Sequence, residues 1–170
     1  IDIGCGVGYG AKLLAMEASC PVTAVDHSDE ALAHAKEYFG DPWVSHQKVD
    51  VRKPERLPLS HRPMFATAFE VLEHLPDPVG LLKRIRKDAP TKFIFGSVPN
   101  EAHTPHDPKK HPWHYRHYTV NELGSLLNRG GWVLHACLGQ KGKTGPASVV
   151  SHTDAKKART LVFVAKRFDD

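Results

Sequence analysis

The segment Asp2-Ile3-Gly4-Cys5-Gly6-Val7-Gly8 joins the end of an apolar strand to a glycine-rich loop. Glycines allow positive φ angles and let a backbone approach a ligand closely. Apolar residues then recur at helical spacing from 9 to 18, so the loop is expected to lead into a helix. The free N–H groups and the positive dipole end at the start of such a helix favour a polar or anionic ligand.

Apolar strands and amphipathic helices alternate along the rest of the chain. Strands are predicted at 22–25, 43–49, 64–69, 93–98, 132–138 and 161–165. Further helices are expected to start at Ser28, at Asp77 and at the capping box formed by Thr119 and Glu122. The polar, basic segment 139–157 is expected to be a loop. This alternation predicts an α/β fold, with helices on both faces of a mostly parallel sheet and ligands beyond the carboxyl ends of its strands.

Composition narrows the class of protein. Of the 170 residues, 41% are hydrophobic and 25% charged, which suits one globular domain. No apolar run approaches the ~20 residues of a membrane span. The cysteines are three in number and form no CxxC pair, which argues against a disulfide framework and favours a cytoplasmic location. The formal net charge of +4 is too small to indicate a nucleic-acid partner by itself.

Carboxylates follow the next two predicted strands. Asp26 ends the strand about twenty residues after the glycine loop, where an acidic side chain can accept both hydroxyls of a ribose. Asp50 ends the following strand, where it can accept from the amino group of an adenine. Either aspartate alone is equally explained by a turn or an N-cap, and residues 6–11 also match a dinucleotide-binding GxGxxA pattern. Together with the glycine loop, the two aspartates indicate a nucleoside site across three strand ends.

These segments resemble a class I S-adenosylmethionine-dependent methyltransferase of the small single-domain type. The resemblance continues through residues 70–75, 97–100 and 117–132, and it covers almost the whole chain. It implies a Rossmann-like sheet of seven strands, in which the last strand is antiparallel and lies between the fifth and the sixth. It also implies one methyltransferase domain over residues 1–170. Because Ile1 already lies within a strand, this domain is expected to be N-terminally incomplete.

The resemblance also implies a site for S-adenosylmethionine. The glycine loop would face the methionine part of the cofactor, and Asp2 would help to place its amino group. Asp26 would hold the ribose and Asp50 would reach the adenine. The implied cofactor-binding residues are Asp2, Gly4, Cys5, Gly6, Gly8, Asp26, His27, Asp50, Val51 and Glu70.

A second motif, Glu70-Val71-Leu72-Glu73-His74, is expected beside the reactive methyl group. A sulfonium methyl group is already activated, so the enzyme mainly aligns the reactants, which can lower the barrier by ~7–11 kcal/mol. A hydroxyl acceptor also needs a base or a metal ion to remove its proton. The predicted catalytic residues are Glu73 and His74 of this motif together with His117.

The same ExxEH spacing resembles ubiquinone-pathway O-methyltransferases and small-RNA 2′-O-methyltransferases, in which such residues hold a divalent ion. That resemblance implies Glu70, Glu73 and His74 as metal ligands, with His114 or His117 as a later ligand. A cluster that orients substrate or supports the fold, without a metal, is the favoured alternative.

The segment 100–118 is rich in histidine, with His103, His106, His111, His114 and His117. Their spacing matches no standard zinc motif. One interpretation is a loop in which Trp113 and Tyr118 pack on the sheet and most histidines are solvated. The other is a lid that binds the acceptor, in which His114, Arg116 and His117 are candidates for a base or an orienting cation.

The expected activity is methyl transfer from S-adenosylmethionine to an O or N atom of a small-molecule acceptor, with no membrane partner. One alternative is a metal-dependent RNA 2′-O-methyltransferase, in which the RNA would contact Lys141, Lys143, Lys156, Lys157 and Arg159. Few aromatic residues interleave these cations, so nucleic acid is the less favoured partner. A non-catalytic cofactor-binding subunit is a further alternative. Asp2 before the glycines, together with Asp50, disfavours an NAD-dependent oxidoreductase.

Overall fold

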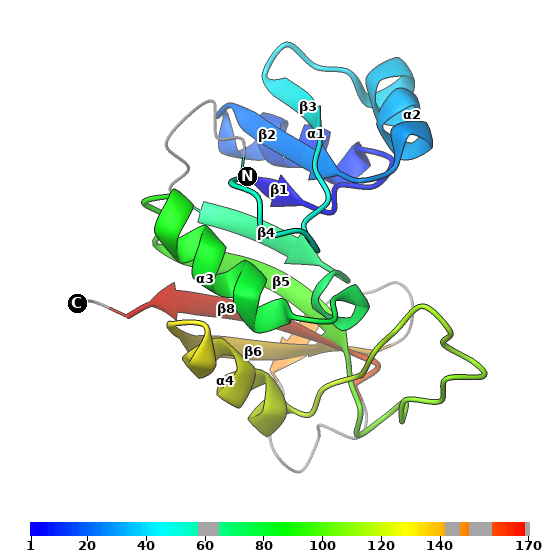
Figure 1. Cartoon of the computed structure of the whole chain (residues 1–170), viewed down its shortest axis with the longest axis vertical. Helices are drawn as coiled ribbons and strands as arrows, with labels where there is room; N and C mark the ends of the chain where they lie inside the picture. The colour runs from blue at the N-terminus through cyan, green and yellow to red at the C-terminus, as the bar shows by residue number, and fades with distance from the viewer. Residues whose placement is uncertain (58–64, 142–146, 150–157, 169–170) are drawn as a thin grey trace.

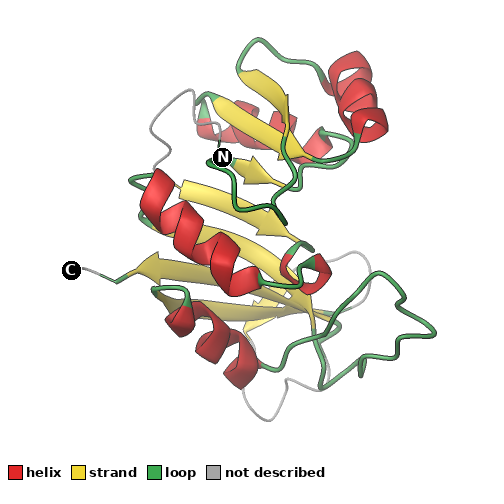
Figure 2. Cartoon of the chain, in the orientation of Figure 1, coloured by secondary structure: helices red, strands yellow, loops and turns green. Residues whose placement is uncertain are grey.

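The computed structural model describes residues 1–57, 65–141, 147–149 and 158–168, which form one twisted sheet flanked by helices (Figures 1 and 2). The strands are β1 (Asp2–Ile3), β2 (Val22–Asp26), β3 (Val44–Lys48), β4 (Phe65–Phe69), β5 (Phe93–Pro99), β6 (Trp132–Gln140), β7 (Ala147–Val149) and β8 (Thr160–Arg167). The helices are α1 (Tyr9–Ala18), α2 (Asp29–Phe39), α3 (Pro78–Asp88) and α4 (Val120–Arg129), with a 3-10 helix, η1 (Leu72–His74), after β4.

The strand order is β3-β2-β1-β4-β5-β8-β6-β7. Strands β1 to β5 are parallel to one another, whereas β8 lies between β5 and β6 and is antiparallel to both. This arrangement confirms the predicted fold class, including the position of the last strand.

The sheet has one strand more than the sequence predicted. Strand β7 lies at the sheet edge, inside the segment expected to be a loop, and pairs with β6 in a register that places Leu138 opposite Val149. A strand of three residues has too little local pattern to be recognised, because its pairing partner rather than its own sequence specifies it. Lys143, Lys156 and Lys157 of this segment lie outside the described residues.

Side-chain caps start three helices where the sequence predicted them. The Ser28 hydroxyl accepts from the Ala31 N–H, and the Asp77 carboxylate accepts from the Gly80 N–H. The capping box between Thr119 and Glu122 is complete, since each side chain accepts from the backbone N–H of the other residue. Across the described part of the chain, no helix combines the length and the apolarity that a membrane crossing requires.

Successive side chains of β2 point alternately into two apolar layers, one on each face of the sheet. Val22 and Ala24 pack with residues of α1, whereas Val25 belongs to the larger core beneath α3 and α4. Because successive strand residues point to opposite faces, α1 covers one face of the sheet and the pair α3 and α4 covers the other.

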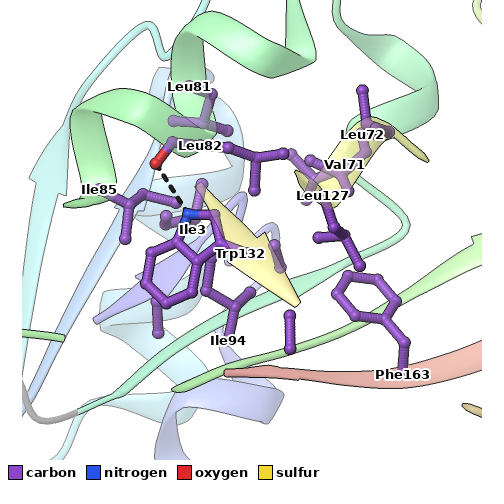
Figure 3. Close-up of a cluster of buried hydrophobic side chains, with 14 of the residues drawn as sticks. Ile3, Val71, Leu72, Leu81, Leu82, Ile85, Ile94, Leu127, Trp132 and Phe163 are labelled. Carbon is purple, nitrogen blue, oxygen red and sulfur yellow. Dashed lines mark hydrogen bonds between the residues drawn. The ribbon is translucent and has the colours of Figure 1, made fainter. Parts of the chain in front are cut away.

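Trp132 lies at the centre of the larger core, as Figure 3 shows. Its side chain is fully buried, and its indole N–H donates to the Leu82 carbonyl oxygen at 3.1 Å. Leu82 comes from α3, so this hydrogen bond links β6 to that helix, and Leu127 of α4 belongs to the same apolar cluster. The core thereby fixes the strands whose carboxyl ends carry the polar side chains.

Candidate active site

A cavity opens where the strand order reverses. From β1 the sheet runs one way through β2 to β3 and the other way through β4 to β5, and ligands bind at such a switch point. The cavity has a volume of about 720 Å³, which lies in the range of small-molecule sites. Its walls include the predicted residues Gly4, Asp26, His27, Asp50, Val51, Glu70 and His74. The other predicted residues, Asp2, Cys5, Gly6, Gly8, Glu73 and His117, are not among its lining residues.

The glycine loop has the positive φ angles that its sequence suggested, with 68° at Gly4, 53° at Gly6 and 89° at Gly8. A Cβ atom on Gly4 would lie 2.7 Å from the Val71 side chain, and one on Gly8 would lie 2.5 Å from the Ala35 Cβ. A Cβ on Gly6 would meet no described atom within 4 Å. Packing therefore requires glycine at the first and third positions, while the middle position faces open space.

Asp26 organises the glycine loop as well as lining the cavity. Its carboxylate accepts from the Gly6 N–H and from the Ser28 N–H, each at 2.9 Å. Each carboxylate oxygen can accept a second hydrogen bond, so capacity remains for a ligand. His27 lies beside it, with Nδ1 3.3 Å from an Asp26 oxygen.

Asp2 and Cys5 lie behind the cavity wall. The Asp2 carboxylate is buried and accepts from the Thr67 hydroxyl at 2.6 Å, and burial raises its pKa. Burial, and then the nearby Asp2, raise the pKa of the Cys5 thiol to about 12, so this cysteine is a poor nucleophile. Thr67 comes from β4, and sequence reasoning missed it because a threonine within an apolar strand has no distinguishing signal.

Asp50 forms a bidentate ion pair that the sequence did not predict. Arg52 Nε donates to Asp50 Oδ1 at 2.8 Å and Arg52 Nη2 donates to Oδ2 at 2.9 Å. The hydrogen bonds from Arg52 lower the pKa of Asp50 to about 2, so the carboxylate stays charged near neutral pH. Both residues line the cavity, which gives the wall at β3 one fixed cation beside one fixed anion.

Arg84 holds the backbone of the segment that carries Asp50. Its guanidinium donates to the carbonyl oxygens of Val51, Lys53 and Glu55, the last at 3.0 Å. Sequence reasoning missed this role because Arg84 stands in a basic helix face that resembles any solvated face.

Glu70 leaves β4 in the left-handed region, with a φ of 53°. A residue other than glycine held there costs on the order of 1–3 kcal/mol and needs support from its surroundings. Ser97 at the end of β5 provides it, because its hydroxyl donates to Glu70 Oε1 at 2.7 Å and its carbonyl accepts from the Glu70 N–H at 3.0 Å. The turn directs the chain from β4 into η1.

Glu73 is fully buried in η1, and neither of its carboxylate oxygens has a hydrogen-bond partner among the described residues. Burial, and then the neighbouring Glu70, raise the pKa of Glu73 to about 8. A buried carboxyl group without a partner is costly as an anion, so Glu73 is mostly protonated near neutral pH.

The histidine-rich segment is held against η1. The Tyr115 N–H donates to the Glu73 carbonyl at 2.8 Å, and the Tyr118 hydroxyl donates to the Leu72 carbonyl at 3.3 Å. Tyr118 is buried, as predicted, but Trp113 is 80% exposed, so its predicted packing on the sheet is wrong. Trp113 instead lines the cavity together with Tyr115, because the turn at residues 111–115 projects over the cavity rather than over the sheet.

Four histidines of this segment form a cluster rather than a solvated set. His106, His111 and His114 are half-buried and His117 is buried, while His103 is exposed. His114 Nδ1 lies 2.8 Å from His117 Nε2, and His117 Nδ1 lies 2.6 Å from the Thr104 carbonyl oxygen. Burial lowers the pKa of His117 and lowers that of His114 to about 4, so both imidazoles are neutral at neutral pH.

One subset of these residues fits a divalent cation. Potential donor atoms of Glu73, His74 and His114 lie within 4.8 Å of one another, and the Glu73 carboxylate has no competing partner among the described residues. Glu70 and His117 were also implied as ligands, but Ser97 already donates to Glu70, and both ring nitrogens of His117 have partners. A mixed carboxylate and imidazole set suits Mn²⁺, Fe²⁺ or Zn²⁺, and such an ion would polarise an acceptor hydroxyl.

The order of the strands, the antiparallel β8 and the glycine-loop cavity together define a class I S-adenosylmethionine-dependent methyltransferase domain. A family model described as "Methyltransferase domain" matches residues 1–135, and the chain belongs to this family. The resemblance inferred from the sequence is thereby confirmed.

Curated relatives carry the same class of name. A probable S-adenosylmethionine-dependent methyltransferase of Mycobacterium tuberculosis is 32% identical over 137 residues, which cover 78% of this chain and 48% of the relative. A ubiquinone biosynthesis O-methyltransferase of Nitrosospira multiformis is 34% identical over 105 residues, which cover 59% of this chain and 42% of the relative. The chain thus spans about half the length of the curated relatives it matches.

Solved structures show the same fold. An S-adenosylmethionine-dependent methyltransferase of Mesorhizobium loti superposes with a TM-score of 0.75 at 16% identity, covering 98% of this chain and 89% of that one. One chain from a Haloferax volcanii complex between the Trm112 methyltransferase activator and a putative methyltransferase superposes with a TM-score of 0.76 at 17% identity. The match covers 99% of this chain and 81% of that one. At these identities the likeness concerns the fold alone.

Proposed function

We propose that this domain binds S-adenosylmethionine in the switch-point cavity and transfers its methyl group to an O or N atom of a small-molecule acceptor. The observation that carries the proposal is the convergence of Gly4 from the positive-φ glycine loop, Asp26 and Asp50 on one cavity at three successive strand ends. A glycine loop at the start of a helix, with a carboxylate at the end of the next strand, is the arrangement that binds a nucleoside.

The cavity wall suggests how the cofactor lies. The free acceptor capacity of Asp26 suits the two ribose hydroxyls, and Asp50, farther along the sheet edge, suits the adenine amino group. The methionine end then falls toward Gly4 and Glu70. The acceptor is placed between that end and the wall formed by His74, Trp113, His114 and Tyr115. Alignment of the two reactants there supplies most of the catalysis that a sulfonium methyl group needs.

Calorimetric titration of the chain with S-adenosylhomocysteine and with NAD tests the cofactor assignment. We expect the homocysteine compound to bind and NAD not to bind. Asp26→Ala should abolish cofactor binding, whereas Asp29→Ala, which removes an exposed carboxylate at the start of α2, should leave it unchanged. Tight NAD binding without a response to S-adenosylhomocysteine would refute the proposal.

The acceptor is tested by a screen of phenols, sugars, amines and RNA oligonucleotides, in which mass spectrometry detects the gain of one methyl group. We expect a hydroxyl- or amine-bearing small molecule to be methylated. Methylation of RNA alone would instead favour an RNA 2′-O-methyltransferase, for which the described residues offer the exposed Lys141 and Arg159. Cofactor binding without turnover on any acceptor class would favour a non-catalytic subunit.

A second candidate property, dependence on a divalent cation, is favoured by the convergence of Glu73, His74 and His114. Direct titration with Mn²⁺ or Zn²⁺ after EDTA treatment tests it, with His103→Ala as a control for exposed histidine. A metal-dependent enzyme would bind one ion, lose that binding in His74→Ala and lose activity in EDTA. Full activity in EDTA would exclude an essential ion.

A further inference from the structure

The hydrogen bond to Thr104 determines which nitrogen of His117 carries the proton. A carbonyl oxygen only accepts, so His117 Nδ1, at 2.6 Å from the Thr104 oxygen, must be the N–H donor. A neutral imidazole carries one N–H, which leaves a lone pair on His117 Nε2. His114 Nδ1 lies 2.8 Å from that nitrogen and must therefore donate to it. Two successive bonds thus fix His114 with its proton on Nδ1 and a lone pair on Nε2.

A second, independent bond fixes His74 in the same way. Its Nδ1 lies 2.8 Å from the Trp113 carbonyl oxygen, which again only accepts, so the Nε2 of His74 also carries a lone pair. The rings of His74 and His114 both line the cavity, and their centroids are 4.5 Å apart. Within the described ranges, neither Nε2 has a hydrogen-bond partner.

His117 itself does not reach the cavity. Its side chain is 1% exposed, and the rings of His106 and His111 face it at centroid distances of 5.2 and 4.7 Å. The Glu101 carboxylate approaches its Nδ1 at 4.0 Å, the same ring edge that donates to Thr104. His117 can therefore act on a bound acceptor only through His114.

We propose that His117 is a positioning residue, which together with the Thr104 carbonyl holds His114 in the Nδ1–H tautomer, so that two imidazole lone pairs are presented to the acceptor. This inference rests on the proposed function and narrows it. A site that offers two lone pairs selects an acceptor atom bearing a hydrogen, a hydroxyl or an amine, over one without a hydrogen, such as a thioether.

This arrangement specifies where the proton of the acceptor goes during methyl transfer. The acceptor oxygen or nitrogen forms its bond to the methyl carbon as the bond from carbon to sulfur breaks, and S-adenosylhomocysteine leaves. The hydrogen of the acceptor passes as a proton to an imidazole Nε2 and then to water. No oxidant or reductant takes part.

Nitrogen-15 NMR of the labelled chain near neutral pH tests the proposal without any ligand, because long-range correlations within the imidazole ring distinguish Nδ1–H from Nε2–H. We expect His74, His114 and His117 to be Nδ1–H. His117→Leu removes the acceptor for His114 and should shift His114 toward Nε2–H. His117→Gln retains one donor for Thr104 and one acceptor for His114, so it should restore the native tautomer. His103→Leu, at the exposed histidine of the segment, should change nothing.

Activity gives the second measurement. His117→Leu should lower kcat by ~10–100-fold, the range found when the hydrogen-bond partner that orients a metal-ligating histidine is lost. The affinity for S-adenosylhomocysteine should not change, and His117→Gln should recover most of kcat. An Nε2–H tautomer for His114 in the unmodified chain, or an unchanged tautomer in His117→Leu, would overturn the proposal. If His117→Leu fails to fold, the spectra of the unmodified chain and of His117→Gln still decide it. If the three histidines are Nδ1–H as expected but the chain binds no S-adenosylhomocysteine, the proposed function is refuted and the positioning role of His117 is not.

Discussion

Replacement of Glu73 by glutamine should make the chain more stable at alkaline pH. The Glu73 side chain is fully buried, and its two oxygens have no partner among the described residues. The folded chain therefore holds the neutral acid, and ionisation opposes the fold. Glutamine has nearly the same shape and no charge at any pH, so it removes the cost of the anion while retaining a polar group.

The size of the effect follows from the pKa of Glu73, which rises from 4.5 to about 8 on folding. At ~1.36 kcal/mol per pKa unit, this difference corresponds to about 5 kcal/mol. A group with a raised pKa in the folded state binds its proton more tightly there than in the unfolded chain. The contribution of Glu73 to the free energy of unfolding is therefore fully present below pH 4.5 and is lost as pH rises to about 8. The stability difference between Glu73→Gln and the unmodified chain should grow by up to ~1.4 kcal/mol per pH unit across this window.

Urea denaturation at a series of pH values, in EDTA, measures this difference. The control is Glu37→Gln, at an exposed position of α2, which should track the unmodified chain at every pH. A difference that stays flat between pH 5 and pH 8 would show that the Glu73 anion is stabilised in the fold, and the reasoning from burial would be wrong. Addition of Mn²⁺ should flatten the slope only if the ion binds Glu73, because a bound cation favours the carboxylate.

Three further substitutions have distinct expected results. Gly8→Ala should lower the free energy of unfolding, measured by urea denaturation, by ~2–5 kcal/mol, because the position has a positive φ and its new Cβ would lie 2.5 Å from the Ala35 Cβ. Gly6→Ala has only the positive φ and should lower it by ~1–2 kcal/mol. Equal losses in the two variants would contradict the packing argument. Arg84→Ala should speed amide hydrogen exchange over residues 50–55 and weaken S-adenosylhomocysteine binding in calorimetry; unchanged exchange there would show that the guanidinium bonds do not hold the segment. Asp50→Asn should change stability by less than ~1 kcal/mol, because its ion pair is partly exposed, yet weaken the same binding; retained affinity would place the adenine elsewhere.

The sequence predicted the sheet well because its signals are local. Apolar runs and caps such as Ser28 and Thr119 act within a few residues, and the structure has strands and helices where they placed them. Strand β7 was missed because its pairing with β6, rather than its three residues, defines it. The glycine loop was recognised for the same local reason, since positive φ at Gly4, Gly6 and Gly8 depends on residue type.

The partners of the site residues were much less predictable than the residues themselves. Thr67, Ser97 and Arg84 contact Asp2, Glu70 and the backbone after β3, yet they stand 65, 27 and about thirty positions away in sequence. Their types do not reveal these partners, because a threonine within a strand, a serine near a strand end and an arginine on a basic helix face each have many ordinary roles. Only the folded sheet shows that one of them supports a strained turn and another holds a cavity wall.

The histidine-rich segment shows why residue type alone misassigns chemical roles. The sequence predicted His117 as a catalytic residue and gave His114 only as a candidate in the lid or as a possible later metal ligand. The structure distinguishes them through a backbone carbonyl, that of Thr104, which has no signature in sequence. Because a carbonyl cannot donate, it orders the protons of both rings and leaves the free lone pair on the ring that lines the cavity. A catalytic assignment in such a cluster therefore depends on the bond that fixes each tautomer and on which ring lines the cavity: the carbonyl-bonded His74 and the His117-bonded His114 line it, whereas His117 does not.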